Sequence, residues 1–135
     1  MDISINSIDK GKNFDFGKTS KEYALYRDIY PESLYDKLIL FNIGQKGQDI
    51  LDLGTGTGVI PRHMVKYGAG FTGADISENQ IKEAISLSEG MDIKYKVCPG
   101  EETGFPDKSF DAVTACQCCH YFDTDRLVPE LKRIL

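Results

Sequence analysis

The chain has 135 residues, of which 41% are hydrophobic and 27% charged, and this composition is typical of one folded domain and not of a disordered segment. Its formal net charge of −5 and its pI of about 5.0 disfavour nucleic acid and anionic membranes as partners, because such partners are met by clustered Lys and Arg. No apolar segment follows a basic start, and no stretch of about 18 apolar residues occurs, so we expect neither secretion nor membrane spanning, but a cytoplasmic protein.

Two helices are expected within residues 1–45. Thr19 and Glu22 have capping-box spacing, and aromatic side chains then recur on one helix face, at Tyr23, Tyr26 and Tyr30. Pro31 is expected to begin a second helix that ends near Gly44, with an apolar face made of Leu34, Leu38 and Phe41. Aromatic faces bury large areas, so the first of these faces is more often part of a core than of a ligand site.

A glycine-rich turn follows the first expected strand. Residues 50–51 are an apolar run, residues 52–58 read Asp-Leu-Gly-Thr-Gly-Thr-Gly, and the stretch from Val59 to Tyr67 has helical spacing that Gly68 can close. A strand, a glycine turn and a helix in succession bring backbone N–H groups and a helix N-terminus to one point, where a small polar ligand can approach. His63 lies on the packing side of this helix and is expected in the core or at an interface.

The spacing of the glycines in this turn distinguishes between two classes of ligand. A dinucleotide turn needs a third glycine where this chain has Val59. Instead Asp52 precedes Gly54 by two residues, so we expect a carboxylate at the mouth of the loop, where it repels phosphate and attracts a cation. The turn therefore favours a positively charged ligand, and a nicotinamide-dependent enzyme stays open as an alternative.

A second strand is expected over residues 70–75 and ends in Asp75, about one strand–helix–strand step after Asp52. A carboxylate at that place can accept hydrogen bonds from both ribose hydroxyls. Ser77 and Gln80 have capping-box spacing before a helix over residues 81–88, which would leave Asp75 free for a ligand. The alternative is that Asp75 itself caps this helix.

The third and fourth strands are expected over residues 93–98 and from Phe110 to about Cys118, joined by a loop rich in Gly and Pro. Cys116 and Cys119 have C-x-x-C spacing, but no second ligand pair accompanies them and they continue a strand-like run. We therefore expect reduced, buried thiols and no metal site.

The Asp52-x-Gly54-x-Gly56-x-Gly58 element, followed by Asp75, resembles the signature of the class I S-adenosylmethionine (SAM) dependent methyltransferases, in particular those of the small-molecule type 11 group. The resemblance implies an α/β fold with a Rossmann-like parallel sheet in the order 3-2-1-4 and flanking helices. It also implies SAM as cofactor, S-adenosylhomocysteine as product and a small-molecule methyl acceptor.

The same resemblance assigns roles to residues along the chain. It implies that Asp75 binds the ribose, that Ile76 lines the adenine and that Arg27 grips the methionine carboxylate. The complete implied set of cofactor-binding residues is Tyr23, Arg27, Asp52, Gly54, Thr55, Gly56, Gly58, Asp75, Ile76, Gln80, Gly100, Glu101, Cys116 and Gln117. No catalytic residue is assigned: His120 is a candidate general base, and a structural, hydrogen-bonded histidine is the alternative.

The last expected helix carries a stripe formed by Leu127, Leu131 and Leu135. The resemblance covers the N-terminal half of the family fold, so we expect one domain over residues 1–135, with lid helices in 1–45 and a core in 46–135, truncated before the last three strands. Strand four would then be an open edge, and we expect self-association through it or through uncovered helices. A catalytically inactive SAM-binding or self-associating module is the alternative function.

Overall fold

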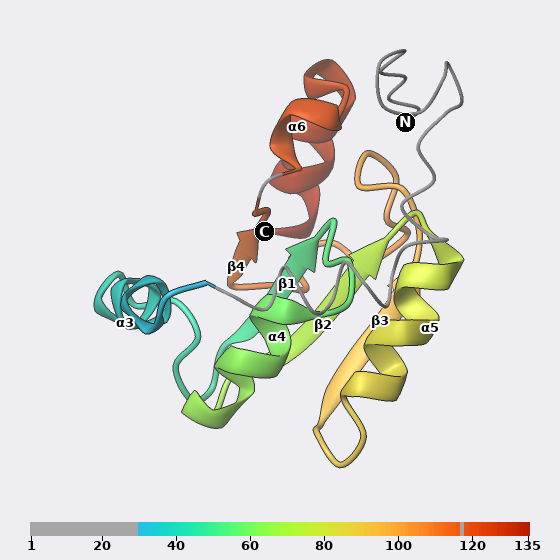
Figure 1. Cartoon of the computed structure of the whole chain (residues 1–135). Coiled ribbons are helices and arrows are strands. Elements are labelled where there is room, and N and C mark those ends of the chain that lie inside the picture. Colours follow the sequence, from blue (N-terminus) through green and yellow to red (C-terminus); the bar gives the residue numbers. More distant parts are fainter. Residues whose placement is uncertain (1–29, 117) are drawn as a thin grey trace, which may run out of the picture.

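A computed structural model describes residues 30–116 and 118–135 and contains one parallel sheet (Figure 1). Its four strands lie in the order β3-β2-β1-β4, and their bounds are β1 Asp49–Leu53, β2 Gly70–Asp75, β3 Ile93–Val97 and β4 Ala112–Thr114. The register places Asp52 of β1 between Gly73 of β2 and Thr114 of β4. The predicted α/β class, the parallel sheet and the 3-2-1-4 order are confirmed.

Helices cover both faces of this sheet. Their bounds are α3 Glu32–Leu40, α4 Val59–Met64 continued by η1 Val65–Tyr67, α5 Glu78–Leu87, η2 Cys119–Tyr121 and α6 Thr124–Ile134. In Figure 1, α4 and α5 run side by side across one face, and α6 lies beyond β4. Over the described ranges, no helix is both long enough and apolar enough to cross a membrane.

The core is divided by the sheet because successive strand residues point to opposite faces. Ile50 belongs to a cluster with Ile60 and Met64 of α4, whereas Leu51 belongs to a cluster with Leu127 and Ile134 of α6. All four residues from 50 to 53 are buried, as expected of a central parallel strand. The sheet therefore presents its carboxyl ends, and the loops that follow them, as a shared edge for a ligand.

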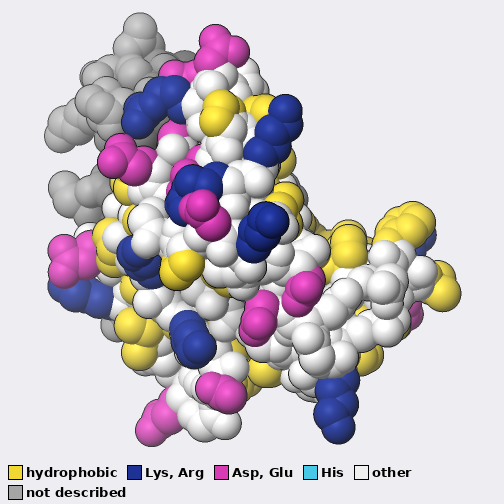
Figure 2. All heavy atoms as spheres, turned by 180° about the vertical axis from the view of Figure 1, so that it is seen from behind, with side chains coloured by type: hydrophobic (Ala, Val, Ile, Leu, Met, Phe, Trp, Pro, Cys, Tyr) yellow, Lys and Arg dark blue, Asp and Glu magenta, His cyan; other side chains and the backbone are white. Residues whose placement is uncertain are grey.

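The apolar face predicted for α3 is only partly correct. Leu34 and Leu38 pack against the core, but Phe41 is 74% exposed because it follows the last helical residue. The side chain that anchors the helix is Tyr35, which is fully buried and stacks on His63 of α4 with ring centroids 4.9 Å apart. Figure 2 shows hydrophobic side chains gathered at the projecting end of the molecule that α3 forms, where Leu40 is also exposed.

Strand four is shorter than predicted. It spans three residues, 112–114, and its pairing with β1 ends at Asp52. The physical reason is that β1 cannot offer an extended partner beyond Leu53, because the chain turns at Gly54 with a φ of 61°. Cys119 accordingly begins a 3-10 turn and does not continue a strand.

Candidate cofactor site

The turn after β1 has a backbone that favours glycine at three places. Gly54, Gly56 and Gly58 have φ values of 61°, 56° and 76°, in the left-handed region that side chains with a Cβ rarely adopt. The Gly58 N–H donates to the Thr55 carbonyl over 2.9 Å, and the Thr55 N–H donates to the carbonyl of Ala74 on β2 over 3.0 Å. The alternating glycines are therefore required by the turn itself, which the Ala74 carbonyl fixes to the neighbouring strand.

Two of these glycines also leave space for neighbouring side chains. A Cβ on Gly54 would lie 2.6 Å from the sulfur of Cys118, and a Cβ on Gly58 would collide with the Tyr95 hydroxyl. Tyr95 extends from β3 past Gly73, and its hydroxyl hydrogen-bonds to Ser88 over 2.8 Å. Cys118 and Tyr95 were not predicted at the site, because both approach the turn from strands or loops distant in sequence.

Asp75 ends β2 and lies beside the turn, as predicted, but its carboxylate is not free. One oxygen accepts the Gly56 N–H over 2.9 Å, and the other accepts the Ser77 N–H over 2.8 Å. That the Ser77 cap leaves Asp75 free for a ligand stays a prediction, although both carboxylate oxygens already accept backbone N–H groups. Ser77 does cap α5, since its hydroxyl accepts from the Gln80 N–H over 3.3 Å. Each carboxylate oxygen has a second lone pair, so Asp75 can still accept hydrogen bonds from a ligand.

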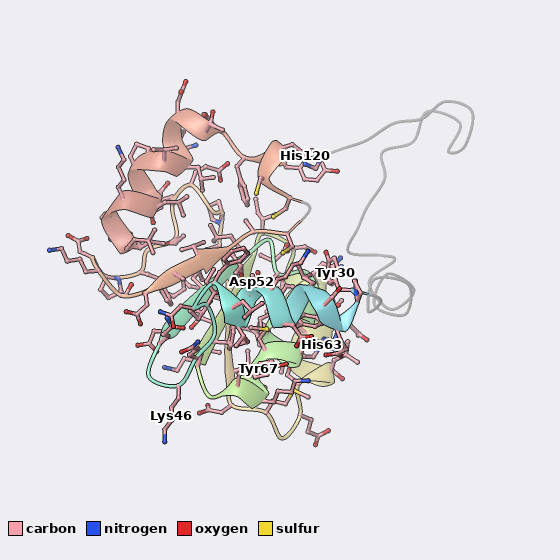
Figure 3. All side chains as sticks on the ribbon, turned by 90° about the vertical axis from the view of Figure 1, so that its left-hand side faces the viewer. Tyr30, Lys46, Asp52, His63, Tyr67 and His120 are labelled. Atoms are coloured by element: carbon pink, nitrogen blue, oxygen red, sulfur yellow. The ribbon has the colours of Figure 1, made fainter. Side chains whose placement is uncertain are left out.

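Asp52 lies beneath the turn and not at its mouth, which corrects the sequence-based expectation. Asp52, which Figure 3 labels, is 2% exposed as a residue. One of its carboxylate oxygens accepts the hydroxyl of Thr114 over 2.6 Å. Burial raises the pKa of this carboxyl from 3.8 to about 6, and the hydrogen bond from Thr114 offsets part of that effect. Asp52 therefore links β1 to β4 at the site, and Thr114 is a site residue that spacing alone did not identify.

Exposed apolar side chains flank Asp75 at the carboxyl ends of β2 and β3. Ile76 is 72% exposed, and Val97, which pairs in register with Asp75, is 47% exposed. Beyond β3, Gly100 is buried, and a Cβ there would lie 2.6 Å from the ring of Phe122. This edge thus combines an acceptor carboxylate with apolar surface, as the base and ribose of a nucleoside require.

The remaining predicted cofactor residues fall into three groups. Thr55 of the turn and Gln80 of α5 are buried, and Cys116 is half-buried after β4, where burial raises its pKa to about 11. Glu101 does not present a free carboxylate, since it accepts the N–H of Asp123 over 2.9 Å. Tyr23, Arg27 and Gln117 lie outside the described residues.

The two histidines have different surroundings. His63 contacts Tyr35 and its Nδ1 hydrogen-bonds to the Val59 carbonyl over 2.9 Å, so the predicted packing role is confirmed. His120 is exposed on η2, where its ring lies 3.9 Å from that of Tyr121, and Figure 3 shows it on a separate segment from Asp52. Its role as a base stays a prediction.

The four cysteines are free thiols. Burial raises the pKa of Cys118 to about 12, and its thiol donates to the Leu53 carbonyl over 3.3 Å. Within the parts of the chain that the structure describes, no group of three or more His, Cys, Asp or Glu side chains has an arrangement that could hold a metal ion.

Comparison with known families identifies the fold. The family model described as a methyltransferase domain matches residues 51–135, which include the glycine turn, Asp75 and α6. The chain belongs to this methyltransferase family. Family and fold together imply SAM as the methyl donor.

A curated relative agrees with that assignment, and two solved structures share the fold. A sterol 24-C-methyltransferase of Gibberella zeae is 34% identical over 129 residues, covering 86% of this chain and 34% of the relative. A SAM-dependent methyltransferase from Aquifex aeolicus is similar with a TM-score of 0.68 and 21% identity, over 90% of this chain and 67% of that one. The [4+2]-cyclase SpnF is also similar, with a TM-score of 0.68 and 26% identity, over 76% and 40% of the two chains. The chain spans between 30% and 48% of the length of the curated relatives it matches.

Proposed function

We propose that this chain is the cofactor-binding part of a SAM-dependent methyltransferase that acts on a small-molecule acceptor in the cytoplasm. The observation that carries the proposal is the contact between the glycine turn and Asp75, in which the Gly56 N–H donates to a carboxylate at the end of β2. This contact lies at the carboxyl edge of the sheet, beside the point between β1 and β4 where the strand order reverses and α/β folds bind ligands.

The arrangement suits a nucleoside that carries positive charge. Asp75 would accept hydrogen bonds from the ribose hydroxyls. The exposed side chains of Ile76 and Val97 would provide apolar contacts to the base. The Asp75 carboxylate beside the turn disfavours a pyrophosphate there. The net charge of −5 likewise supports a small acceptor over nucleic acid.

The protein's part in methyl transfer is mainly positional. Bound SAM supplies an activated methyl group on a sulfonium. The chain would hold the acceptor in line with that methyl group at about 3–3.5 Å, which supplies much of the rate acceleration. His120 would act as a general base only for an acceptor that must lose a proton.

A second candidate function is a SAM-binding module without methyl transfer. A structurally similar protein is named as a cyclase, so this fold does not by itself imply methyl transfer. Turnover of labelled SAM with a panel of small acceptors distinguishes the two candidates: labelled product supports the first, whereas tight binding with no transfer to any acceptor supports the second.

Calorimetric titration tests the proposal itself. We expect SAM and S-adenosylhomocysteine to bind at one site and NAD to bind far more weakly. Binding of NAD in preference to both would contradict the proposal and favour the nicotinamide alternative.

A further inference from the structure

Helix α6 contacts the loop between β3 and β4 over most of that loop's length. At one end, the Asp123 N–H before α6 donates to Glu101 over 2.9 Å. At the other end, the Phe110 N–H donates to the Ile134 carbonyl over 3.1 Å. The loop is thus attached to both ends of one helix.

Glu130 makes the central contacts between helix and loop. One of its carboxylate oxygens accepts both the N–H of Thr103, over 2.8 Å, and the hydroxyl of Thr103, over 2.5 Å. Arg133 binds the same carboxylate with two nitrogens, over 2.9 and 2.8 Å, and donates to the Phe105 carbonyl over 2.6 Å. These charge-assisted bonds hold the pKa of Glu130 at about 2, with Arg133 as the largest cause.

Thr103 is also held from the side of the sheet. Lys96 of β3 donates to its carbonyl over 2.7 Å and lies 4.5 Å from the centre of the Phe105 ring. The backbone N–H, carbonyl and hydroxyl of Thr103 are therefore all hydrogen-bonded, and the residue is 1% exposed. These bonds satisfy the polar groups of a buried residue and fix the position of Thr103 within the loop.

Thr103 lies a few residues after the point where the chain leaves β3 beside the candidate site. The Cys98 N–H donates to the Asp75 carbonyl over 3.0 Å, so the loop departs from β3 directly beside the carboxylate that we assign to the ribose. Gly100 and Glu101 lie between that point and Thr103. With the base over Val97, as proposed above, the backbone groups of these two residues are the next along the chain that would face it.

We propose that Glu130 is a positioning residue for recognition of the nucleoside base, acting through Thr103 on the backbone of residues 100–101. The inference rests on the proposed function and extends it, because it assigns selectivity for the base to a helix on the opposite side of the loop. Glu130 itself does not touch the ligand in this scheme.

The test compares S-adenosylhomocysteine with S-inosylhomocysteine, which differs at the base edge, by calorimetry on the wild type, Glu130→Ala, Glu130→Gln and Lys132→Ala. Lys132 is an exposed residue on the same helix and serves as the matched control. We expect the wild type and Lys132→Ala to favour the adenosyl ligand by about tenfold or more, and Glu130→Ala to reduce that preference to within about threefold. Glu130→Gln keeps an acceptor for Thr103 and should retain most of the preference.

A purely structural role for Glu130 would lower both affinities in parallel and leave their ratio unchanged, and that result overturns the inference. A wild type that binds both ligands equally well also overturns it, while leaving the proposed function standing. A wild type that binds neither ligand removes the proposed function, and the inference with it. If Glu130→Ala does not fold, Thr103→Val decides, with an expected loss of about threefold in the ratio.

Discussion

Asp52 carries a buried carboxyl group at the point where β1 meets the glycine turn. In the unfolded chain its pKa is close to 3.8, and in the folded protein it is about 6, because burial disfavours the charged form. Between these values the folded state retains a proton that the unfolded state has lost. Ionisation of Asp52 therefore costs stability as the pH rises from about 4 to about 6, by up to about 3 kcal/mol.

Asp52→Asn should remove this pH dependence, since asparagine can still accept the Thr114 hydroxyl and does not ionise. Relative to the wild type, we expect the variant to gain about 2 kcal/mol in unfolding free energy between about pH 4.5 and about pH 7, measured by urea denaturation. The lowered pKa of Glu130 also makes the unfolding free energy depend on pH, in the opposite direction and at lower pH. This contribution is the same in both proteins, so it cancels in the comparison. Parallel pH profiles for the two proteins would contradict the assignment.

Asp75→Ala should weaken SAM binding by about 1.5–3 kcal/mol, the scale of hydrogen bonds to a charged group, measured by calorimetry. The change also removes the acceptor for the Gly56 N–H, so the turn should become more open to hydrogen exchange. Asp92→Ala, at an exposed carboxylate before β3, is the control and should bind SAM as the wild type does. Unchanged affinity in Asp75→Ala would remove this residue from the site.

A comparison of two glycines, one of them in the glycine turn, distinguishes the cost of backbone strain from the cost of steric collision. Gly58 and Gly47 both have positive φ values, 76° and 90°, but a Cβ at Gly47 meets nothing within 4 Å, whereas one at Gly58 meets Tyr95. Gly47→Ala should therefore cost only the left-handed strain of about 1–2 kcal/mol. Gly58→Ala should cost about 1–3 kcal/mol more, from overpacking against the Tyr95 ring. Equal losses in unfolding free energy would contradict the packing described for β3 and the turn.

The elements that follow from local pattern were predictable from the sequence. The turn needs glycine at alternate positions, and Ser77 caps α5 through a bond between near neighbours, so spacing is sufficient for both. The bond between Asp52 and Thr114 and the bonds between Glu130 and Thr103 join residues distant in sequence, and periodicity carries no information about such pairs. The length of β4 was overestimated for the same reason, because its end depends on where β1 turns away.

At the scale of the whole molecule, β4 is an edge strand in the described sheet, and self-association through it stays a prediction. If it occurs, light scattering at rising concentration should show a species of twice the monomer mass. A wild type that remains strictly monomeric at high concentration would contradict the prediction.

A crystal structure with S-adenosylhomocysteine is the decisive test of the site proposed at Asp75 and the glycine turn. We expect both ribose hydroxyls within hydrogen-bond distance of the Asp75 carboxylate, the ligand against the backbone of Gly56, and the base beside Ile76 and Gly100. A well-ordered nucleoside bound elsewhere on the molecule, or no bound nucleoside beside Gly56 at saturating ligand, would contradict the proposed site.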